Sequence, residues 1–255
     1  MSRHFSRLLV FGIAGLTSSA VPAADRLPKD GTWARYFVHN KRANGVEDIM
    51  HTTIRFVGTV TEHGERYRWI EWTDAFEIDG NDGKTVIRKD VQKFLVSEKS
   101  LRTSPHPLRY FIRGWRGEEG KTAAAIEPDR LHRETADVQG ITLLFLPGVL
   151  KTTKPTRNSR AIDYQQGQLR IRSGRAGTYR AVRHAITAPL VYTWKTDYEL
   201  WLHKDVPLGM ASVKMKLVFI RKAADGTTTV RNLATTEYSV EAWGTNAKSA
   251  LPNAR

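Results

Sequence analysis

Short segments in which apolar and polar residues alternate recur along most of this chain, and they limit the fold more than any other feature. In ASVKMKLVF (211–219), Val213, Met215, Leu217 and Phe219 fall on one side and the two lysines on the other. A period of two residues is that of a β-strand with one buried and one solvated face. We therefore expect a mainly β (α+β) fold built on an antiparallel sheet whose apolar face must be covered.

Turn residues between these segments predict hairpins. Gly64 lies between the strand-like segments 48–60 and 66–72 and suits a positive φ. Asp225-Gly226 is the strongest hairpin signal of the chain, because Asp-Gly favours a tight turn between strands. In the segment 66–72 the large side chains are expected on two faces: Tyr67 and Trp69 on one, Ile70 and Trp72 on the other.

One segment has a helical period instead. Leu108, Phe111, Ile112 and Trp115 stand at i, i+3, i+4 and i+7, which is one face of a helix. We therefore expect an amphipathic helix over 108–115 that covers the apolar face of the sheet. The segment 86–101 is ambiguous between strand and helix, and we favour a strand or a mixed segment.

The first two dozen residues have the layout of a secretory signal peptide. Arg3 and Arg7 precede the short apolar run 8–16, and small residues follow it. Cleavage after Ala20, Ala23 or Ala24 would give a mature chain that begins between Val21 and Asp25. An uncleaved amphipathic start is the alternative. We thus expect a signal peptide at 1–24, a single β-rich domain at 25–247 and a C-terminal tail at 248–255.

The chain has no cysteine. This excludes disulfides, thiolate chemistry and cysteine-based zinc sites, and also lipid attachment through a cysteine behind the apolar run. Hydrophobic residues make up 40% and charged residues 26%, which is typical of a globular protein. We expect a periplasmic or secreted protein.

The charge is strongly basic, at +14 from 40 basic and 26 acidic residues. The segment 151–184 contains one acidic residue, Asp163, and nine basic residues: Lys151, Lys154, Arg157, Arg160, Arg170, Arg172, Arg175, Arg180 and Arg183. Such an excess favours an anionic partner. For an exported chain this would be an anionic membrane surface or an acidic glycan rather than nucleic acid, with Arg170, Arg172 and Arg175 in contact. A solvated basic face is the alternative.

Motifs of catalysis and cofactor binding are missing from the sequence. It has no nucleophile elbow, phosphate-binding loop or dinucleotide fingerprint, and its eight histidines show no metal-ligand spacing. We expect no enzyme, cofactor or metal. The alternative is a carboxylate pair, Glu71 and Asp74, beside Trp69 and Trp72 in a glycan-cleaving site. Carboxylates on a solvated strand face are the more ordinary interpretation.

A curved sheet with an apolar interior can hold an acyl chain. The candidates that would line such a cavity or its lid are large apolar residues of the strands and the expected helix: Trp69, Leu108, Phe111, Ile112, Trp115, Met215, Leu217 and Phe219.

The order of these features resembles a known family. The predicted signal peptide is followed by four segments in this order: KFLVSEKSL (93–101), PLRYFIRGW (107–115), FLPG (145–148) and YELWLHKDVPLGMASVKMKL (198–217). This order is similar to that of LolA/LolB-like secreted bacterial proteins. The resemblance implies a half-barrel of antiparallel strands, closed by one or a few helices, and in the carriers of the family a cavity for lipoprotein acyl chains.

Three functions are compatible with these features. The first is an exported binding protein for a lipid or other amphiphile. The second is an enzyme on a β-scaffold that acts on glycans, and the third an envelope structural or interaction protein without a small ligand. The identity of a ligand and the oligomeric state stay open.

Overall fold

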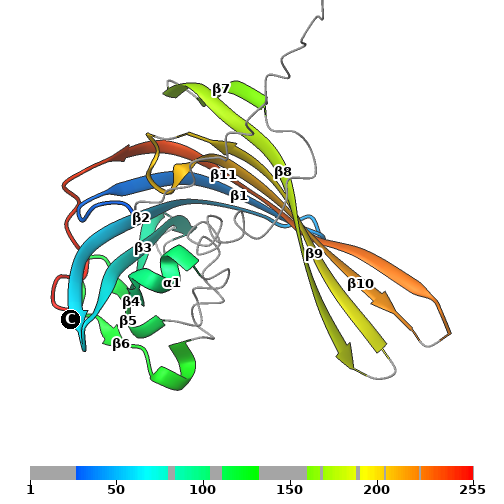
Figure 1. Cartoon of the computed structure of the whole chain (residues 1–255), viewed down its shortest axis with the longest axis horizontal. Helices are drawn as coiled ribbons and strands as arrows, with labels where there is room; N and C mark the ends of the chain where they lie inside the picture. The colour runs from blue at the N-terminus through cyan, green and yellow to red at the C-terminus, as the bar shows by residue number, and fades with distance from the viewer. Residues whose placement is uncertain are drawn as a thin grey trace, which may run out of the picture.

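The computed structural model describes residues 27–79, 84–103, 111–131, 160–166, 169–187, 190–203, 205–223 and 225–254. For 79, 103, 160–198, 200, 202 and 208 it describes the backbone alone. The predicted signal peptide, Leu108 and the FLPG sequence lie outside the described residues. The rest forms one curved antiparallel sheet of 11 strands, so the expected mainly β class is confirmed (Figure 1).

The sheet consists of two meanders that meet at its centre. The first contains β1 (Trp33–Arg42), β2 (Glu47–Glu62), β3 (Glu65–Asp79), β4 (Thr85–Ser97), β5 (Phe111–Glu118) and β6 (Ala124–Ala125). The second contains β7 (Arg160–Gln166), β8 (Leu169–Thr187), β9 (Leu190–Leu202), β10 (Met210–Lys222) and β11 (Thr228–Gly244). The strand order is β6-β5-β4-β3-β2-β1-β11-β10-β9-β8-β7. Pairing of β1 with β11 therefore joins segments that are far apart in the sequence.

The predicted hairpins are confirmed. β2 pairs with β3 across a turn in which Gly64 has φ 78°. β10 pairs with β11 across a turn in which Gly226 has φ 85°, and the Asp225 carboxylate accepts the Thr227 N–H at 2.8 Å. Positive φ is accessible to glycine at little cost, which explains why these two positions end the strands.

The sheet is open and curved around a hollow. Register shifts interrupt the pairing in β1, β2, β4 and β10, and such bulges increase strand bend and twist. α1 (Glu98–Thr103) lies in the hollow (Figure 1). Since Leu101 of α1 packs into the main apolar cluster, the face that carries this cluster is the concave one.

The alternation in β3 distributes its large side chains as predicted. Ile70 and Trp72 belong to the concave cluster, whereas Tyr67 and Trp69 form a second cluster with Leu95 on the convex face. The ambiguous segment 86–101 is mixed, because β4 ends at Ser97 and α1 follows directly.

The predicted helix over 108–115 is wrong for the described part of that segment. From Phe111 to Glu118 the chain is strand β5, paired with β4. Val96 pairs with Phe111 and Leu95 with Arg113, so that Ile112 is an extra residue in the ladder. This shift puts Phe111 in the concave cluster, while Trp115 packs on the convex face. A bulged strand thus produced a spacing that imitates a helical stripe.

The C-terminal residues extend beyond β11 and pack against the convex face of the sheet. Leu251 and Ala254 are each only 2% exposed and form a third apolar cluster with Val91 of β4. The segment predicted as a tail is therefore docked on the sheet over residues 249–254.

Candidate functional site

The concave face carries the largest apolar cluster of the described residues. Strands of both meanders contribute to it, and its largest fully buried side chains are Tyr36, Phe56, Trp72, Phe94 and Tyr238. Met50, Met215 and Trp201 are half-buried and pack against it. The result is one continuous apolar cluster along the inside of the curve.

Two polar side chains of this face, Tyr36 and Asp74, are hydrogen-bonded. The Tyr36 hydroxyl donates to the Met210 carbonyl at 3.2 Å. Asp74 Oδ1 accepts the Thr52 hydroxyl at 2.6 Å and the Trp72 indole N–H at 2.9 Å. Burial raises the pKa of the Asp74 carboxyl, and the nearby Asp90 carboxylate adds to this shift. Burial also raises the pKa of Tyr238, with Asp74 as a smaller cause.

A row of carboxylates crosses three strands beside the apolar cluster. Asp74 of β3 pairs in register with Asp90 of β4, and Asp90 with Glu118 of β5. Like charges directly opposite each other destabilise a sheet. Arg88 donates to Asp90 at 2.8 Å and Lys121 pairs with Glu118 at 2.5 Å, which offsets part of this repulsion. No His, Asp or Glu group within the described ranges has the geometry of a metal site.

Sequence reasoning missed Asp90 and Glu118. A usable signal existed for Asp90, because Asp74 and Asp90 each lie eight residues from Asp82 in the turn-rich segment 78–84. In a hairpin, residues at equal distances from the turn lie opposite each other. Glu118 had no such signal, since its partner strand is connected through 98–110.

The predicted cavity residues do not gather in one place. Phe111 is buried in the concave cluster and stacks on Phe94 with ring centroids 4.8 Å apart. Met215 lies at the margin of the same cluster. Trp69 and Trp115 instead contact each other edge to face on the convex side, with centroids 5.1 Å apart.

Three further candidates for the cavity lie outside the concave apolar cluster. Ile112 is 44% exposed at the extra position of β5. Leu217 and Phe219 are half-buried in β10, outside the apolar clusters that the described residues form. The expected strand β10 is confirmed, and Leu233 of β11 is an extra residue in its ladder beside Leu217 and Val218.

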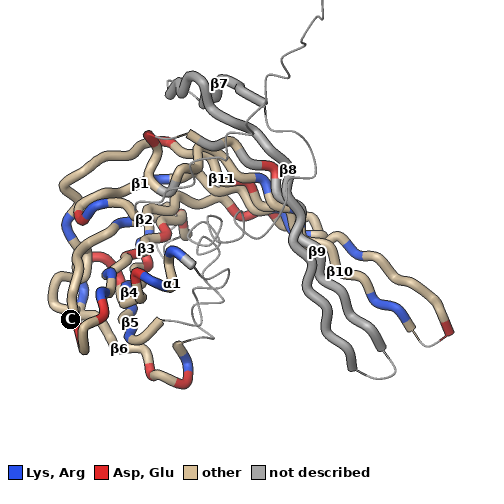
Figure 2. Tube along the Cα trace, viewed as in Figure 1, with Lys and Arg blue, Asp and Glu red and all other residues tan. Residues whose placement is uncertain are grey.

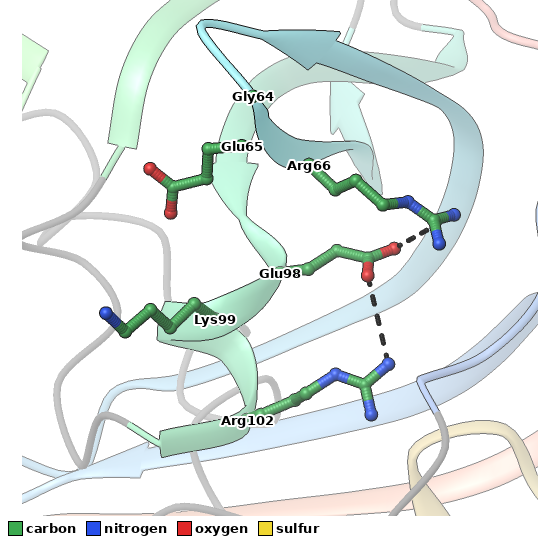
Figure 3. A pocket seen from close by; sticks show the side chains of 6 residues that line it. All are labelled: Gly64, Glu65, Arg66, Glu98, Lys99 and Arg102. Atoms are coloured by element: carbon green, nitrogen blue, oxygen red, sulfur yellow. Dashed lines mark ion pairs between the residues drawn. The ribbon is translucent and has the colours of Figure 1, made fainter.

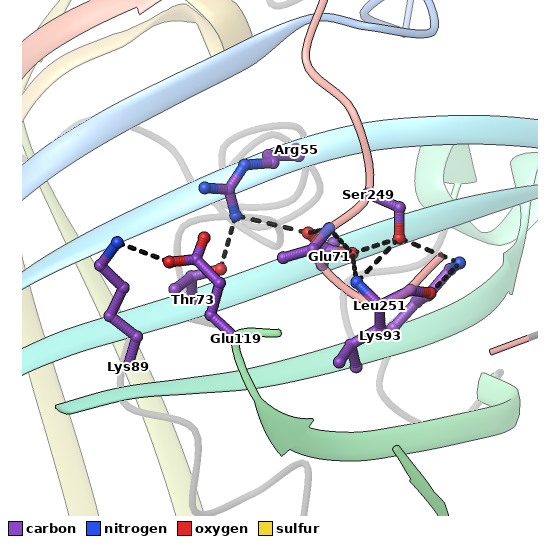
Figure 4. Close-up of polar contacts among 9 residues, drawn as sticks. Arg55, Glu71, Thr73, Lys89, Lys93, Glu119, Ser249 and Leu251 are labelled. Atoms are coloured by element: carbon purple, nitrogen blue, oxygen red, sulfur yellow. Dashed lines mark hydrogen bonds and ion pairs between the residues drawn. The ribbon is translucent and has the colours of Figure 1, made fainter. Parts of the chain in front are cut away.

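A buried polar network holds the C-terminal segment to the convex face (Figure 4). The Glu71 side chain is fully buried. Its Oε2 accepts the Ser249 hydroxyl at 2.6 Å and the Leu251 N–H at 3.3 Å. Ala250 N–H donates to Oε1 at 2.9 Å, and Arg55 donates to the same oxygen at 3.4 Å. Successive backbone N–H groups that wrap one carboxylate are a typical anion nest.

Lys93 completes this network. Its ammonium donates to the Ser249 hydroxyl and to the Leu251 carbonyl, both at 3.2 Å, and lies 5.4 Å from the Trp69 ring. Lys93 is 5% exposed, so its charge is stabilised by these groups rather than by water. The network explains how two charged side chains are accommodated under the C-terminal segment.

Glu71 and Asp74 do not form a carboxylate pair. Glu71 lies with Thr73 on the convex face, where Arg55 contacts both. Asp74 points to the concave face, where it binds Thr52 and Trp72. Two residues an odd number apart on a regular strand lie on opposite faces, so no substrate can lie between these two carboxylates.

The predicted anionic-surface candidates Arg170, Arg172 and Arg175 lie in β8, and their side chains are outside the described part of the chain. Over the described strands, acidic and basic residues are interspersed (Figure 2). The role of the basic stretch stays a prediction.

Helices long and apolar enough to cross a membrane do not occur among the residues that the structure describes.

No protein-family model and no curated protein matches the chain. Two solved structures are distantly similar. One is a protein assigned as exported, with a YmcC-like fold, from Bacteroides fragilis NCTC 9343. It is 10% identical to this chain and has a TM-score of 0.23; the match covers 86% of this chain and 97% of that chain. The other is assigned as a lipoprotein of Parabacteroides distasonis ATCC 8503, 8% identical, with the same coverage and a TM-score of 0.21. TM-scores this low carry no conclusion about this chain, and its resemblance to LolA/LolB-like proteins stays a prediction.

Proposed function

We propose that this protein is an exported, periplasmic or secreted binding protein that holds a lipid or another amphiphile in the hollow of its curved sheet. The observation that carries the proposal is the continuous apolar lining of the concave face by strands of both meanders. An apolar surface enclosed by a curved sheet is a typical lipid-binding arrangement.

The sequence supports the same proposal. The charged, apolar and small-residue segments at 1–24 follow the order of an export signal. The half-barrel implied by the LolA/LolB-like resemblance would present its concave face to an acyl chain. The half-buried Met50 and Met215 suit such a ligand, because methionine side chains adapt to irregular apolar shapes.

The test is binding of a fluorescent fatty acid, together with native mass spectrometry of protein purified without detergent. We expect a co-purifying amphiphile and saturable probe binding. Met215→Asn should weaken the probe about tenfold, because a ligand in the hollow would desolvate the new amide.

Lys216→Asn is the matched control. It introduces the same side chain one residue along β10, at an exposed position on the opposite face, and should leave probe affinity unchanged. Equal probe affinity of the two variants, or a wild-type protein that binds no amphiphile, would contradict the proposal.

A further inference from the structure

The two ends of the sheet differ in what lies beside the ends of their strands. At one end the β2–β3 turn lies next to α1, where Arg66 and Arg102 flank the Glu98 carboxylate at 3.7 and 3.8 Å (Figure 3). At the opposite end the β10–β11 hairpin extends past the last residue of β1 (Figure 1). We call residues 218–222 and 228–233 of this hairpin the arm.

One side of the arm is a strand edge without a neighbouring strand. The pairing of β11 with β1 ends at Ala234, opposite Arg42, and the Ala43 N–H donates to the Leu233 carbonyl at 2.9 Å. In the part of the chain that the structure describes, residues 228–232 then pair with β10 alone. All five of these residues are exposed. The backbone groups on their outer side are therefore available to a further strand.

The hydrogen-bond pattern of the hairpin identifies which residues point outward. The Ala223 N–H donates to the Thr227 carbonyl at 2.9 Å, where the ladder between β10 and β11 begins. In an antiparallel ladder, hydrogen-bonded pairs alternate with pairs whose N–H and C=O groups point away from each other. The register that follows makes Thr228, Val230 and Asn232 the outward-directed residues. These three residues present both of their backbone groups at the free edge.

This edge has little of the protection that natural sheets give to their edges. Proline, lysine and bulges are common means of keeping two edges from pairing. Residues 228–232 contain neither proline nor lysine, and the bulge at Leu233 lies just outside them. Their one charged residue, Arg231, directs its backbone groups to β10. Val230, in the middle of the edge, is 61% exposed, so an apolar side chain lies where a second strand would cover it.

An antiparallel second copy of the same edge fits these directions. Residues that form hydrogen-bonded pairs must point toward each other, so Thr228, Val230 and Asn232 pair only among themselves. Full overlap then gives one register, with Val230 opposite the same residue of the second copy and Thr228 opposite Asn232. This arrangement has a two-fold axis at Val230, and a contact of this kind closes as a dimer.

The side chains are compatible with this register. On one face Val230 lies opposite Ile220 of β10, so the two copies together form one row of four apolar residues. On the other face Thr229 lies opposite Arg231 of the second copy, and no like charges are directly opposite each other. The exposed apolar side chain at the centre of the edge is then covered by its counterpart.

We propose that this protein forms a homodimer through antiparallel pairing of residues 228–232 of β11, which joins the two sheets edge to edge. The dimer does not depend on the proposed amphiphile, because the arm contributes no residue to the concave apolar cluster. An edge of five residues is small compared with the interface of a stable dimer. The Kd is therefore in the range of weak complexes, about 10–100 μM.

Sedimentation velocity between about 5 and about 500 μM measures this Kd. Val230→Pro removes the N–H that the Val230 carbonyl of the second copy accepts. The hydrogen bonds to β10 stay in place, because this N–H points away from that strand and proline is tolerated at such edge positions. We expect the Kd to rise at least about tenfold. Thermal unfolding checks that the variant is folded. A wild-type protein that stays monomeric at the highest concentration overturns the proposal.

Thr229→Glu tests the register in the opposite direction and does not depend on how the proline variant folds. It places a carboxylate opposite Arg231 of the second copy, twice in each dimer, and Arg221 of its own chain makes the charge tolerable in the monomer. We expect the Kd to fall about three- to tenfold. Thr228→Glu is the matched control, because it adds the same charge at the neighbouring exposed position, opposite Asn232. This control should not tighten the dimer, and equal tightening by both variants would show that the register is wrong.

The size of the assembly distinguishes this dimer from other edge pairings. A species of twice the monomer mass supports the two-fold contact. β8 offers a different edge, since beyond Ala176 its described residues pair with β9 alone. Pairing of β11 with that edge would be a contact between unlike surfaces, which adds further molecules instead of closing. Species larger than a dimer that grow with protein concentration would therefore overturn the proposal.

Discussion

Glu71 and Asp74 are three residues apart on β3, yet their carboxylates lie on opposite faces of the sheet and have different surroundings. On the convex face Glu71 is surrounded by donors: a guanidinium, a hydroxyl and two backbone N–H groups. On the concave face Asp74 has two neutral donors and a like charge opposite it. A buried carboxylate can stabilise or destabilise a fold, depending on what covers it.

The origin of the donors explains this difference. The groups around Glu71 come from β2 and from the segment after β11, which are 16 and about 180 positions away along the chain. The groups around Asp74 come from its own strand and from the neighbouring β2. The convex carboxylate is therefore held by a long-range contact, while the concave carboxylate has only local donors and faces another acid.

The largest expected effect is that of Glu71→Gln. The new amide would direct N–H groups at the N–H and O–H donors of 249–251 and leave Arg55 without its carboxylate. We expect the free energy of unfolding to fall by about 3–5 kcal/mol, as when one partner of a buried ion pair is removed. Urea denaturation measures it. Glu77→Gln, at an exposed position of the same strand, should change stability by less than about 0.5 kcal/mol. Equal effects of the two variants would contradict the role of Glu71.

Removal of residues 249–255 should have a smaller effect. The deletion exposes apolar surface that Leu251 covers, which we expect to cost about 2–3 kcal/mol, but it also admits water to Glu71. In the shortened chain Glu71→Gln should cost less than about 1 kcal/mol, because the donors of 249–251 are gone. A double-mutant cycle by urea denaturation measures this coupling. An undiminished cost of Glu71→Gln would show that the C-terminal segment is not its partner.

The smallest effect is expected for Asp74→Asn, and it should have the opposite sign. Both hydrogen bonds of Asp74 go to Oδ1, which an asparagine retains, while the buried charge disappears. We expect stability at pH 7 to stay equal or to rise by about 1 kcal/mol or less.

The pH dependence of this difference follows from the raised pKa of Asp74. A raised folded-state pKa means that the ionised carboxyl destabilises the fold at neutral pH. This penalty is lost as the pH falls through the folded-state pKa towards the ordinary value. Thermal unfolding of both proteins between pH 7 and pH 4 should therefore show the advantage of Asp74→Asn shrinking with acid. A difference that does not change with pH, or a clear loss of stability at pH 7, would contradict this interpretation.

Part of the fold and of the site could be predicted from local patterns. The strand class, the turns at Gly64 and Gly226 and the two faces of β3 follow from alternation and turn chemistry over fewer than ten residues. The helix over 108–115 was wrong because the same apolar spacing occurs in a bulged strand. Pairing with β4, which lies earlier in the chain, decided between the two.

By itself the sequence determined that this chain forms antiparallel strands with one apolar face, because a period of two and the φ preferences of glycine act within each segment. Only the tertiary structure decided which side chains meet across the sheet. The pairing of β1 with β11, the position of Glu118 opposite Asp90 and the contact of Ser249 with Glu71 all join separate segments. Strand register and the docking of distant segments depend on the packing of the whole chain, so local patterns carry little information about them.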